Sequence, residues 1–322
     1  MDTGSHLLFG ATLAGLAMLE PAAAQQPELT QAILTATLIG SHAPDIDSIA
    51  RLKGYPAYIR FHRGMTHSLP ALLVWPLILT MPIASLFHIW DQALYVLAWS
   101  FIAVAFHVFL DWLNVYGVQC FRPLSKRWHH LDILPVFDPA LFLLHGTGLL
   151  VWWLAEDGFR PGVMFAWIYT ATAVYIAARA AHHSWAVKRV RAVLGKEGIC
   201  QVMPGMHWFR WQFVMETDSH FYTGTLLYGH VCLKDEYAKG SSNAVVQATM
   251  AAGGVRAFLY FAERVHVSCT EQPDGYVVQW RDVRFWYNHR LPFGVDVRLD
   301  RNLNVREHTL GWRKKMWDPP FV

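Results

Sequence analysis

Charged residues are scarce in this chain of 322 residues. Only 16% are Asp, Glu, Lys or Arg, whereas 54% are hydrophobic and 15 are tryptophan. A soluble domain has roughly 25% charged residues. The scarcity therefore indicates a membrane protein, or a chain of which one half lies in a membrane. The formal net charge of +3 is small, so we expect no nucleic-acid partner.

Cysteines are also few, and their spacing excludes the common zinc-ribbon and C-x-x-C arrangements. We interpret the four as reduced thiols, with disulfides as the less favoured alternative. The N-terminus lacks the basic segment of a signal peptide. Ala22–Ala24 resembles a cleavage site, but we expect no cleavage there, because it would remove His6. The cysteines are Cys120, Cys200, Cys232 and Cys269.

Long apolar runs are what the sequence has instead. A helix needs about 20 residues to cross a bilayer. Four charge-free segments approach that length and predict membrane helices, although prolines interrupt the first. Two shorter apolar segments, 7–19 and 29–40, predict short helices that complete the bundle. The four predicted spans are residues 68–86, 93–110, 140–155 and 162–178.

Basic residues are distributed unequally between the predicted loops. Loops 41–67 and 113–139 contain several Lys and Arg, as does the segment after the last span, whereas loop 87–92 contains none. The positive-inside rule places the basic loops in the cytoplasm. We therefore predict a polytopic membrane domain over residues 1–190.

From about residue 196 the apolar runs stop and the charge density rises. Residues 294–300 alternate with period two, which is typical of a half-buried strand. We expect further strands at 257–269, 276–287 and 303–309, with turns at 273–275 and 300–302. The predicted fold class is thus an α-helical membrane bundle, followed over 196–322 by a mostly antiparallel β-rich soluble domain in the cytoplasm.

Two polar signatures lie beside the apolar runs. One consists of His42–Asp47 and His62–Ser68, and the other is the pair His107 and Asp111. Residues four apart share one face of a helix, so this pair can reach one ion. Imidazoles and carboxylates are the usual ligands of zinc and similar divalent ions. Ionisable groups beside membrane segments are costly and usually functional.

The loop signature adds its own candidates. Proline 44 favours an extended backbone before it, and a spacing of two would place Asp45 and Asp47 on one side of an extended segment. Either carboxylate could act as a general base, and Arg63 could hold a phosphate. A single histidine near a membrane end is more often an interfacial residue, and for His145 an interhelical hydrogen bond is as plausible as ligation. Collectively, however, the candidate ligands predict a metal site: His6, Asp45, Asp47, His62 or His67, His107 and Asp111.

These motifs resemble a known family. Gly4–His6, His42–Asp47, the run His-Arg-Gly-Met-Thr-His-Ser at 62–68 and His107–Asp111 are similar to motifs of the inner-membrane metal-dependent hydrolases, also described as LexA-binding, inner-membrane-associated hydrolases. The resemblance covers roughly residues 1–190. It implies a bacterial inner-membrane location and a distant relation to zinc-dependent phospholipase C. It also implies ligand roles for the candidates above. That phospholipase uses a processed N-terminal amine and a later His-x-x-x-Glu motif, which this sequence lacks, so we expect one or two ions rather than three.

Two hypotheses follow. The first is an integral-membrane hydrolase with a divalent metal, zinc by preference, that acts on a phosphoester or lipid-borne substrate at the cytoplasmic membrane face. Asp45, Asp47 and Arg63 would be its catalytic residues, and membrane lipid its partner. The second is a non-catalytic, metal-stabilised membrane scaffold or regulator whose C-terminal domain binds a cytoplasmic protein.

Overall fold

The computed structural model describes residues 1–156, 158–240 and 243–313, and the chain forms two compact units. The first unit, the helical unit, comprises Met1–Asp47 and Arg63–His182. The second unit, the β unit, comprises Ser48–His62 and the chain from His183 onward. We call Ser48–His62 the arm. The tail of the predicted C-terminal domain, residues 314–322, lies outside the described residues.

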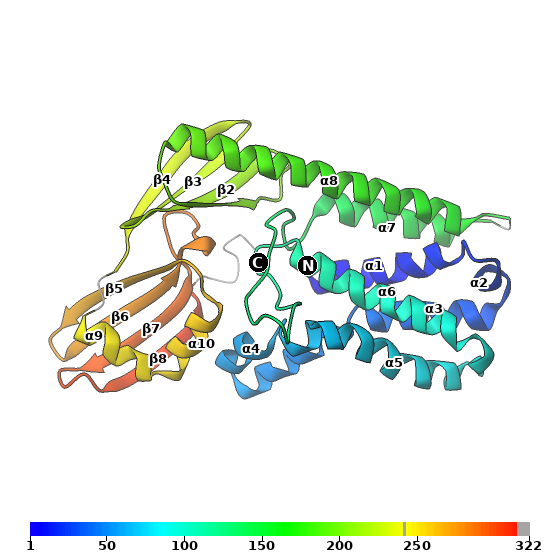
Figure 1. The fold of residues 1–322 in the computed structure, drawn as a ribbon, viewed down its shortest axis with the longest axis horizontal. Coiled ribbons are helices and arrows are strands. Elements are labelled where there is room, and N and C mark those ends of the chain that lie inside the picture. Colours follow the sequence, from blue (N-terminus) through cyan, green and yellow to red (C-terminus); the bar gives the residue numbers. More distant parts are fainter. Residues whose placement is uncertain (157, 241–242, 314–322) are drawn as a thin grey trace. The chain divides into compact units, whose positions relative to one another are not determined.

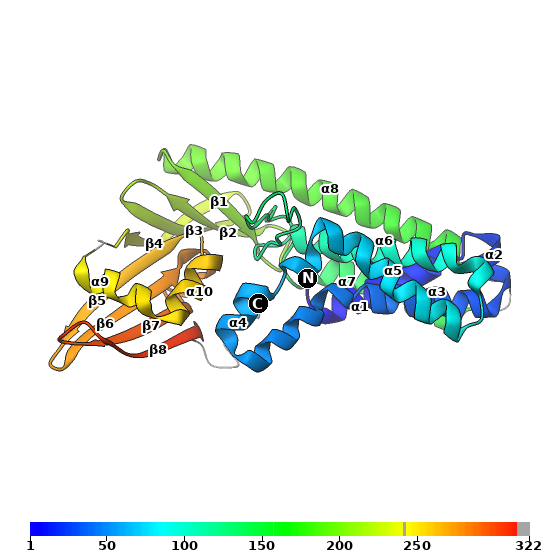
Figure 2. The same ribbon diagram turned by 60° about the horizontal axis from the view of Figure 1, so that its bottom comes forward.

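The helical unit is a bundle in which helices distant in sequence lie side by side (Figures 1 and 2). Helix α1 packs on α3, α6 and α7, and α5 packs on α3 and α6. The helices are α1 (Thr3–Ala17), α2 (Pro21–Gln25), α3 (Pro27–Gly40), α5 (Leu69–Leu86), α6 (Ala93–Trp112), α7 (Pro139–Leu154) and α8 (Pro161–Leu194), which continues into the β unit. Short 3-10 turns join them: η1 (Ala43–Lys53), η2 (Met65–His67) and η3 (Trp90–Gln92).

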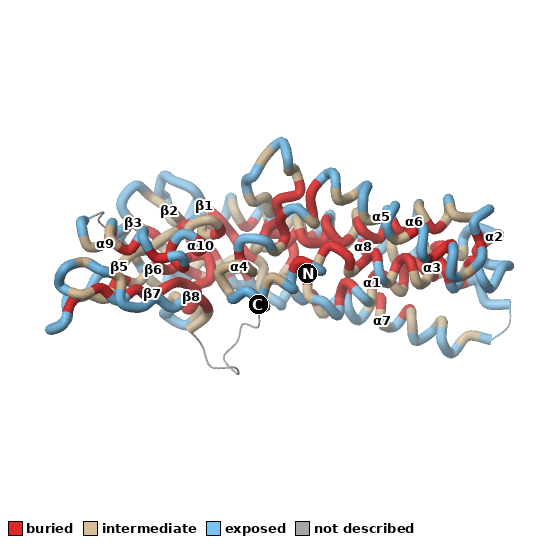
Figure 3. Tube along the Cα trace, turned by 90° about the horizontal axis from the view of Figure 1, so that it is seen from below, coloured by how far each residue is buried: buried red, intermediate tan, exposed pale blue. Residues whose placement is uncertain are grey.

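Three helices of the described chain are each long and apolar enough to cross a membrane: Leu69–Leu86, Trp90–Trp112 and Pro161–Leu194. The predicted helices at 68–86 and 93–110 are confirmed. The segment predicted at 162–178 continues to Leu194, and α7 is apolar but shorter, with 16 residues. Large apolar side chains such as Leu77 and Trp153 are exposed. Exposed residues recur along the helices of this unit (Figure 3). This pattern is what a lipid-facing surface requires.

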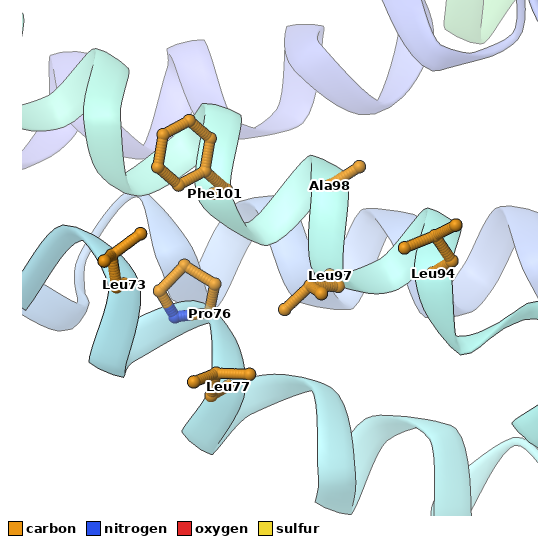
Figure 4. Close-up of a pocket in the computed structure, with 7 residues that line it drawn as sticks. All are labelled: Leu73, Pro76, Leu77, Leu94, Leu97, Ala98 and Phe101. Carbon is orange, nitrogen blue, oxygen red and sulfur yellow. The ribbon is translucent and has the colours of Figure 1, made fainter.

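An apolar groove of about 420 Å³ lies between α5 and α6 (Figure 4). It contains no side chain that could bind a metal or transfer a proton, so it is separate from the polar signatures. Its lining residues are Leu73, Pro76, Leu77, Leu94, Leu97, Ala98 and Phe101.

A small polar network lies inside the bundle, around His145 of α7. The two ring nitrogens of His145 lie 2.9 Å from Oγ1 of Thr12 and 2.8 Å from Oγ1 of Thr172. Tyr169 joins the network through Thr12, at 3.0 Å. Hydrogen bonds across helices satisfy polar groups that water cannot reach. Of the two alternatives for His145, the structure shows the interhelical hydrogen bond.

The β unit contains two four-stranded antiparallel sheets with sequential strand order. The first sheet, not foreseen from the sequence, has β1 (Ile199–Pro204), β2 (Arg210–Glu216), β3 (His220–Leu227) and β4 (His230–Ala238). The second has β5 (Val265–Gln272), β6 (Gly275–Asp282), β7 (Phe293–Asp300) and β8 (Val305–Trp312). Helices α9 (Ala244–Ala248) and α10 (Gly253–Phe261) precede it.

The prediction of a strand over 257–269 is wrong for its first part. Residues 257–261 form the end of α10, whose apolar face is buried, and the strand begins only at Val265. Tertiary packing explains the difference, because Phe258 packs against Phe293 of β7, with ring centroids 5.8 Å apart. The expected strands at 276–287, 294–300 and 303–309 correspond to β6, β7 and β8, although β6 ends at Asp282.

The end of α8 and the arm pack on elements of the β unit. The end of α8 places Ala186 and Val190 against Trp211 and Phe213 of the first sheet. Helix α4 of the arm (Tyr55–Phe61) packs on α10 and β8. The arm, which interrupts the helical unit in sequence, thus belongs structurally to the β unit. The four cysteines are free, as expected.

Candidate metal centre

Four potential metal ligands converge inside the helical unit. His107 and Asp111 lie one turn apart on α6, Asp45 lies in η1, and His67 ends η2. Nε2 of His67 and Nε2 of His107 are 3.2 Å apart. Oδ1 of Asp45 lies 3.5 and 3.6 Å from these nitrogens, and Oδ2 of Asp111 lies 3.5 and 3.6 Å from them. Ligands of a tetrahedral zinc ion stand about 3.3–3.4 Å apart, given bonds of about 2.0–2.1 Å. The four atoms therefore fit one small cation.

The hydrogen bonds behind the two histidines fix which nitrogen carries the proton. Nδ1 of His107 donates to the carbonyl oxygen of Ser41 at 2.7 Å. The hydroxyl of Thr66 donates to Asp47 at 2.5 Å, so it accepts from Nδ1 of His67 at 3.0 Å. Both Nε2 atoms of the neutral rings are then unprotonated. Two Nε2 atoms that face each other at 3.2 Å beside two carboxylates need a positive charge between them, supplied by a proton on His67 or by a metal ion.

The electrostatics of His67 agree with this requirement. Burial alone would lower its pKa, but the carboxylates of Asp111, Asp45 and Asp47 outweigh burial and raise the pKa to about 10. The cluster therefore holds a positive charge strongly. A metal ion would compete with that proton, because a ligating imidazole must be neutral.

The two oxygens of Asp111 have different environments. Oδ1 accepts from Nη2 of Arg63 at 2.9 Å, is ion-paired with the α-amino group of Met1, and lies 3.3 Å from Nε2 of His6. Oδ2 is buried and accepts no hydrogen bond from any described residue. It points instead at the two histidines. A buried carboxylate oxygen without a donor is costly unless an ion coordinates it.

His6 lies beside the four donors. Its ring stacks on His107 with centroids 3.8 Å apart, and its side chain is buried. It is outside the set of four converging atoms. Its Nε2 lies 3.0 Å from the α-amino group of Met1. A ligand role for His6 remains a prediction.

Asp47 and Arg63 make hydrogen bonds to each other and to residues around the four donors. Oδ2 of Asp47 accepts from the backbone N–H of Arg63 at 3.0 Å, in addition to the hydroxyl of Thr66. Arg63 adopts a φ of 59°, a conformation that this hydrogen bond holds. Its guanidinium group is buried between Asp111 and Asn114, 3.1 Å from Oδ1 of Asn114. Arg63 thus orients a potential ligand in the structure.

The expected extended backbone around Asp45 and Asp47 is wrong. Residues 43–53 form a 3-10 helix, in which the N–H of Asp45 bonds to the carbonyl of His42 at 3.0 Å. Oδ1 of Asp45 lies beside the Nε2 atoms of His67 and His107. Oδ2 of Asp47 lies 3.6 Å from the other ring nitrogen of His67, Nδ1, and also accepts from Thr66 and the backbone of Arg63. His62 belongs to the β unit, where it stacks on Tyr58 at 4.6 Å, and its ligand role is still a prediction.

Sequence reasoning missed three supporting groups: the carbonyl of Ser41, the hydroxyl of Thr66 and the side chain of Asn114. Asn114 is fully buried, and its Oδ1 also accepts from the backbone of Tyr116 at 3.0 Å. Its position, three residues after Asp111, places both on one face of the chain end of α6. That spacing could have revealed Asn114. The carbonyl of Ser41 leaves no signal in the sequence.

Two family models match this chain. Residues 1–181 match the family described as YdjM inner membrane protein, and residues 244–317 match the YfhP C-terminal alpha/beta plait domain. The chain is 33% identical over 321 residues to the protein YfhP of Bacillus subtilis strain 168. The aligned region covers 97% of this chain and 95% of that protein. No solved structure matches it. The helical unit with its polar centre is thus the part shared with a membrane-protein family, and this chain belongs to the YdjM inner membrane protein family.

Proposed function

We propose that this protein is an integral-membrane, divalent-metal-dependent hydrolase that acts on a phosphoester. The observation that carries the proposal is the set of four converging donors, with the two imidazole Nε2 atoms 3.2 Å apart. Histidine and carboxylate ligands of this kind suit zinc and other first-row divalent ions. When bound, such an ion supplies a Lewis acid and lowers the pKa of a coordinated water to about 7.

The residues have distinct roles in this proposal. His67, His107 and Asp111 are almost completely buried and would hold the ion. Asp45 is the most exposed of the four, with 17% of its side chain accessible, so it lies at the open side of the site. Three protein ligands and one open position are typical of catalytic zinc. Asp45 would then accept a proton from the attacking water as the general base.

Asp47 and Arg63 would orient the ligands rather than react themselves. Asp47 fixes Thr66, which in turn fixes the tautomer of His67. Arg63 pairs with Oδ1 of Asp111, and Oδ2 is left directed at His67 and His107, where the ion would bind. Supporting hydrogen bonds of this kind orient metal ligands and tune the basicity of the site. A phosphate-binding role for Arg63 would require its guanidinium group to leave Asn114.

A multi-pass topology with the site at the cytoplasmic face completes the proposal. The donors come from η1, η2 and the last turns of α6, all beside predicted basic loops. Basic loops favour the cytoplasmic side and attract anionic lipid head groups. A phosphoester in a lipid head group is therefore the preferred substrate class.

A second candidate is a structural metal site in a membrane scaffold. The presence of four protein donors favours it, because closed sites with four ligands are typical of structural zinc. In that case Asp45 is a ligand rather than a base. The C-terminal domain would then bind a cytoplasmic protein partner.

One substitution separates the two candidates. Asp45→Asn keeps the shape of the side chain but removes the base. If the protein is a hydrolase, purified Asp45→Asn retains its metal and loses hydrolysis of bis(p-nitrophenyl) phosphate. If the site is closed and structural, Asp45→Asn loses metal, and the wild type hydrolyses no ester. His230→Ala, which changes an exposed histidine on β4, is the matched control for both measurements.

A further inference from the structure

The arm, Ser48–His62, buries some of its apolar side chains and exposes others. Ile59 is buried, and helix α4 packs on α10 and β8 within the β unit. Three other large apolar side chains of the arm are exposed. Ile49 is 67% exposed, Leu52 is 85% exposed and Phe61 is 61% exposed. These three side chains are therefore not buried by the rest of the described chain.

The charge of the arm has one sign. It contains Arg51, Lys53 and Arg60 and no acidic residue, and all three basic residues are exposed. Exposed apolar side chains interleaved with basic ones are typical of segments that lie in a membrane interface. The basic groups attract anionic lipids, and the apolar groups enter the boundary between head groups and acyl chains.

Chain connectivity keeps the arm close to a bilayer surface. The hydrogen bond from the N–H of Arg63 to Asp47 closes the arm at its base. Helix α5, which is long and apolar enough to span a membrane, begins at Leu69. Leu69 lies seven positions after His62, a reach of at most about 25 Å even when fully extended. The arm cannot move far from the surface at which α5 enters the lipid.

We propose that the arm is an interfacial membrane anchor that binds anionic phospholipid head groups through Arg51, Lys53 and Arg60 and inserts Ile49, Leu52 and Phe61 among them. The partner of these side chains is the bilayer that α5 enters. Only a short segment separates the arm from that apolar helix, and the charge of the arm complements anionic lipid. The inference does not depend on hydrolysis, because none of these side chains belongs to the metal centre.

The anchor also has a consequence for the metal centre. Asp47 directly precedes the arm and Arg63 directly follows it. Asp47 binds Thr66, which orients His67, and Arg63 binds Asp111. An arm seated in the lipid surface would hold Asp47 and Arg63 at the membrane interface. The site would then face head groups rather than the bulk cytoplasm.

The test uses the full chain in lipid nanodiscs and an environment-sensitive fluorophore at Leu52→Cys, with the four native cysteines replaced by alanine. The nanodiscs contain phosphatidylcholine with or without phosphatidylglycerol, and a lipid with a nitroxide near the head group acts as quencher. Ile49→Cys is the second labelled variant. Leu233→Cys, an exposed leucine on β4, is the matched control in the same unit.

The anchor predicts that labels at 49 and 52 are quenched in anionic nanodiscs and the label at 233 is not. It also predicts that Lys53→Gln and Arg60→Gln each lower the ratio of inserted to free arm by about fivefold, the effect of one basic residue at an anionic surface. Equal quenching with and without phosphatidylglycerol would overturn the anionic specificity. Quenching at 49 and 52 no stronger than at 233 would overturn the anchor itself and leave these side chains to a protein partner.

Discussion

The imidazole ring of His6 stacks on that of His107, with centroids 3.8 Å apart and an angle of 23° between the planes. The stack ties α1, the first helix, to the helix that carries two potential ligands. It fixes the ring plane of His107, while the carbonyl of Ser41 fixes its proton. His6 can therefore matter to metal binding without itself being a ligand.

Substitutions at His6 separate these two roles. We expect His6→Phe to retain the stack and most of the metal affinity, and His6→Ala to lower the affinity by roughly 10–100-fold, as loss of a supporting contact does. The measurement is competition of the purified protein with a chromophoric zinc chelator. Equal loss in both variants would show that a ring nitrogen of His6 binds the ion.

The donors themselves are tested by metal content. His107→Ala and Asp111→Ala remove atoms at the centre of the cluster, so we expect bound metal to fall from about one ion per chain to near zero. Plasma mass spectrometry after removal of free metal gives the count. The control is His230→Ala, which should keep the wild-type content. Wild-type protein purified without metal, and unable to bind added zinc, would contradict the whole assignment.

Thr66 tests the support behind His67. Thr66→Val removes the hydroxyl that links Nδ1 of His67 to Asp47, so the ring loses its fixed tautomer. We expect zinc affinity to fall by about 10–100-fold. Thr170→Val is the control, because Thr170 is exposed on α8 and bonds only to the carbonyl of Ala166 among the described residues. An unchanged affinity in Thr66→Val would mean that the orientation of His67 does not depend on this contact.

The network around His145 is expected to stabilise the bundle and not the metal. Thr172→Val removes the partner of one ring nitrogen, and interhelical hydrogen bonds in membranes contribute about 0.6 kcal/mol on average and up to about 1.7. Unfolding in mixed detergent micelles should show a loss of this size, with metal content unchanged. Thr170→Val on the same helix should show neither effect. Loss of metal in Thr172→Val would place His145 in the functional site.

The β unit has its own pH dependence, at Asp296 on β7. Burial would raise the pKa of this carboxyl, but hydrogen bonds from Arg313 and Arg281 outweigh it and hold the pKa below its ordinary value. A carboxyl with a lowered folded-state pKa contributes stability above its unfolded pKa of about 3.9 and loses it as the pH falls.

We therefore expect the melting temperature of wild-type protein, followed by near-ultraviolet circular dichroism, to fall more between about pH 5 and pH 3 than that of Asp296→Asn. Glu307→Gln, which removes a largely exposed carboxyl on β8, should behave as the wild type does. Parallel curves for all three proteins would show that the ion pairs of Asp296 contribute nothing to stability.

Much of the helical unit follows from the sequence. Charge-free runs of nearly 20 residues have one stable arrangement in lipid, the helix, because every backbone group must be satisfied within the segment. The pair His107 and Asp111 could be predicted in the same way, since a spacing of four fixes a shared helical face. The period-two alternation of 294–300 likewise identified β7.

The tertiary structure decided what local pattern could not. Asp45 and Asp47 are equivalent in the sequence, but in the structure Asp45 lies beside the Nε2 atoms of His67 and His107, whereas Asp47 lies beside Nδ1 of His67 and binds Thr66. The arm lies between two motifs of the metal centre in sequence, yet it packs with the β unit. Residues 257–261 became helix because α10 buries them against β7. Local periodicity determines which face of an element is apolar, whereas the meeting of distant segments depends on the free energy of packing them together, which no single segment encodes.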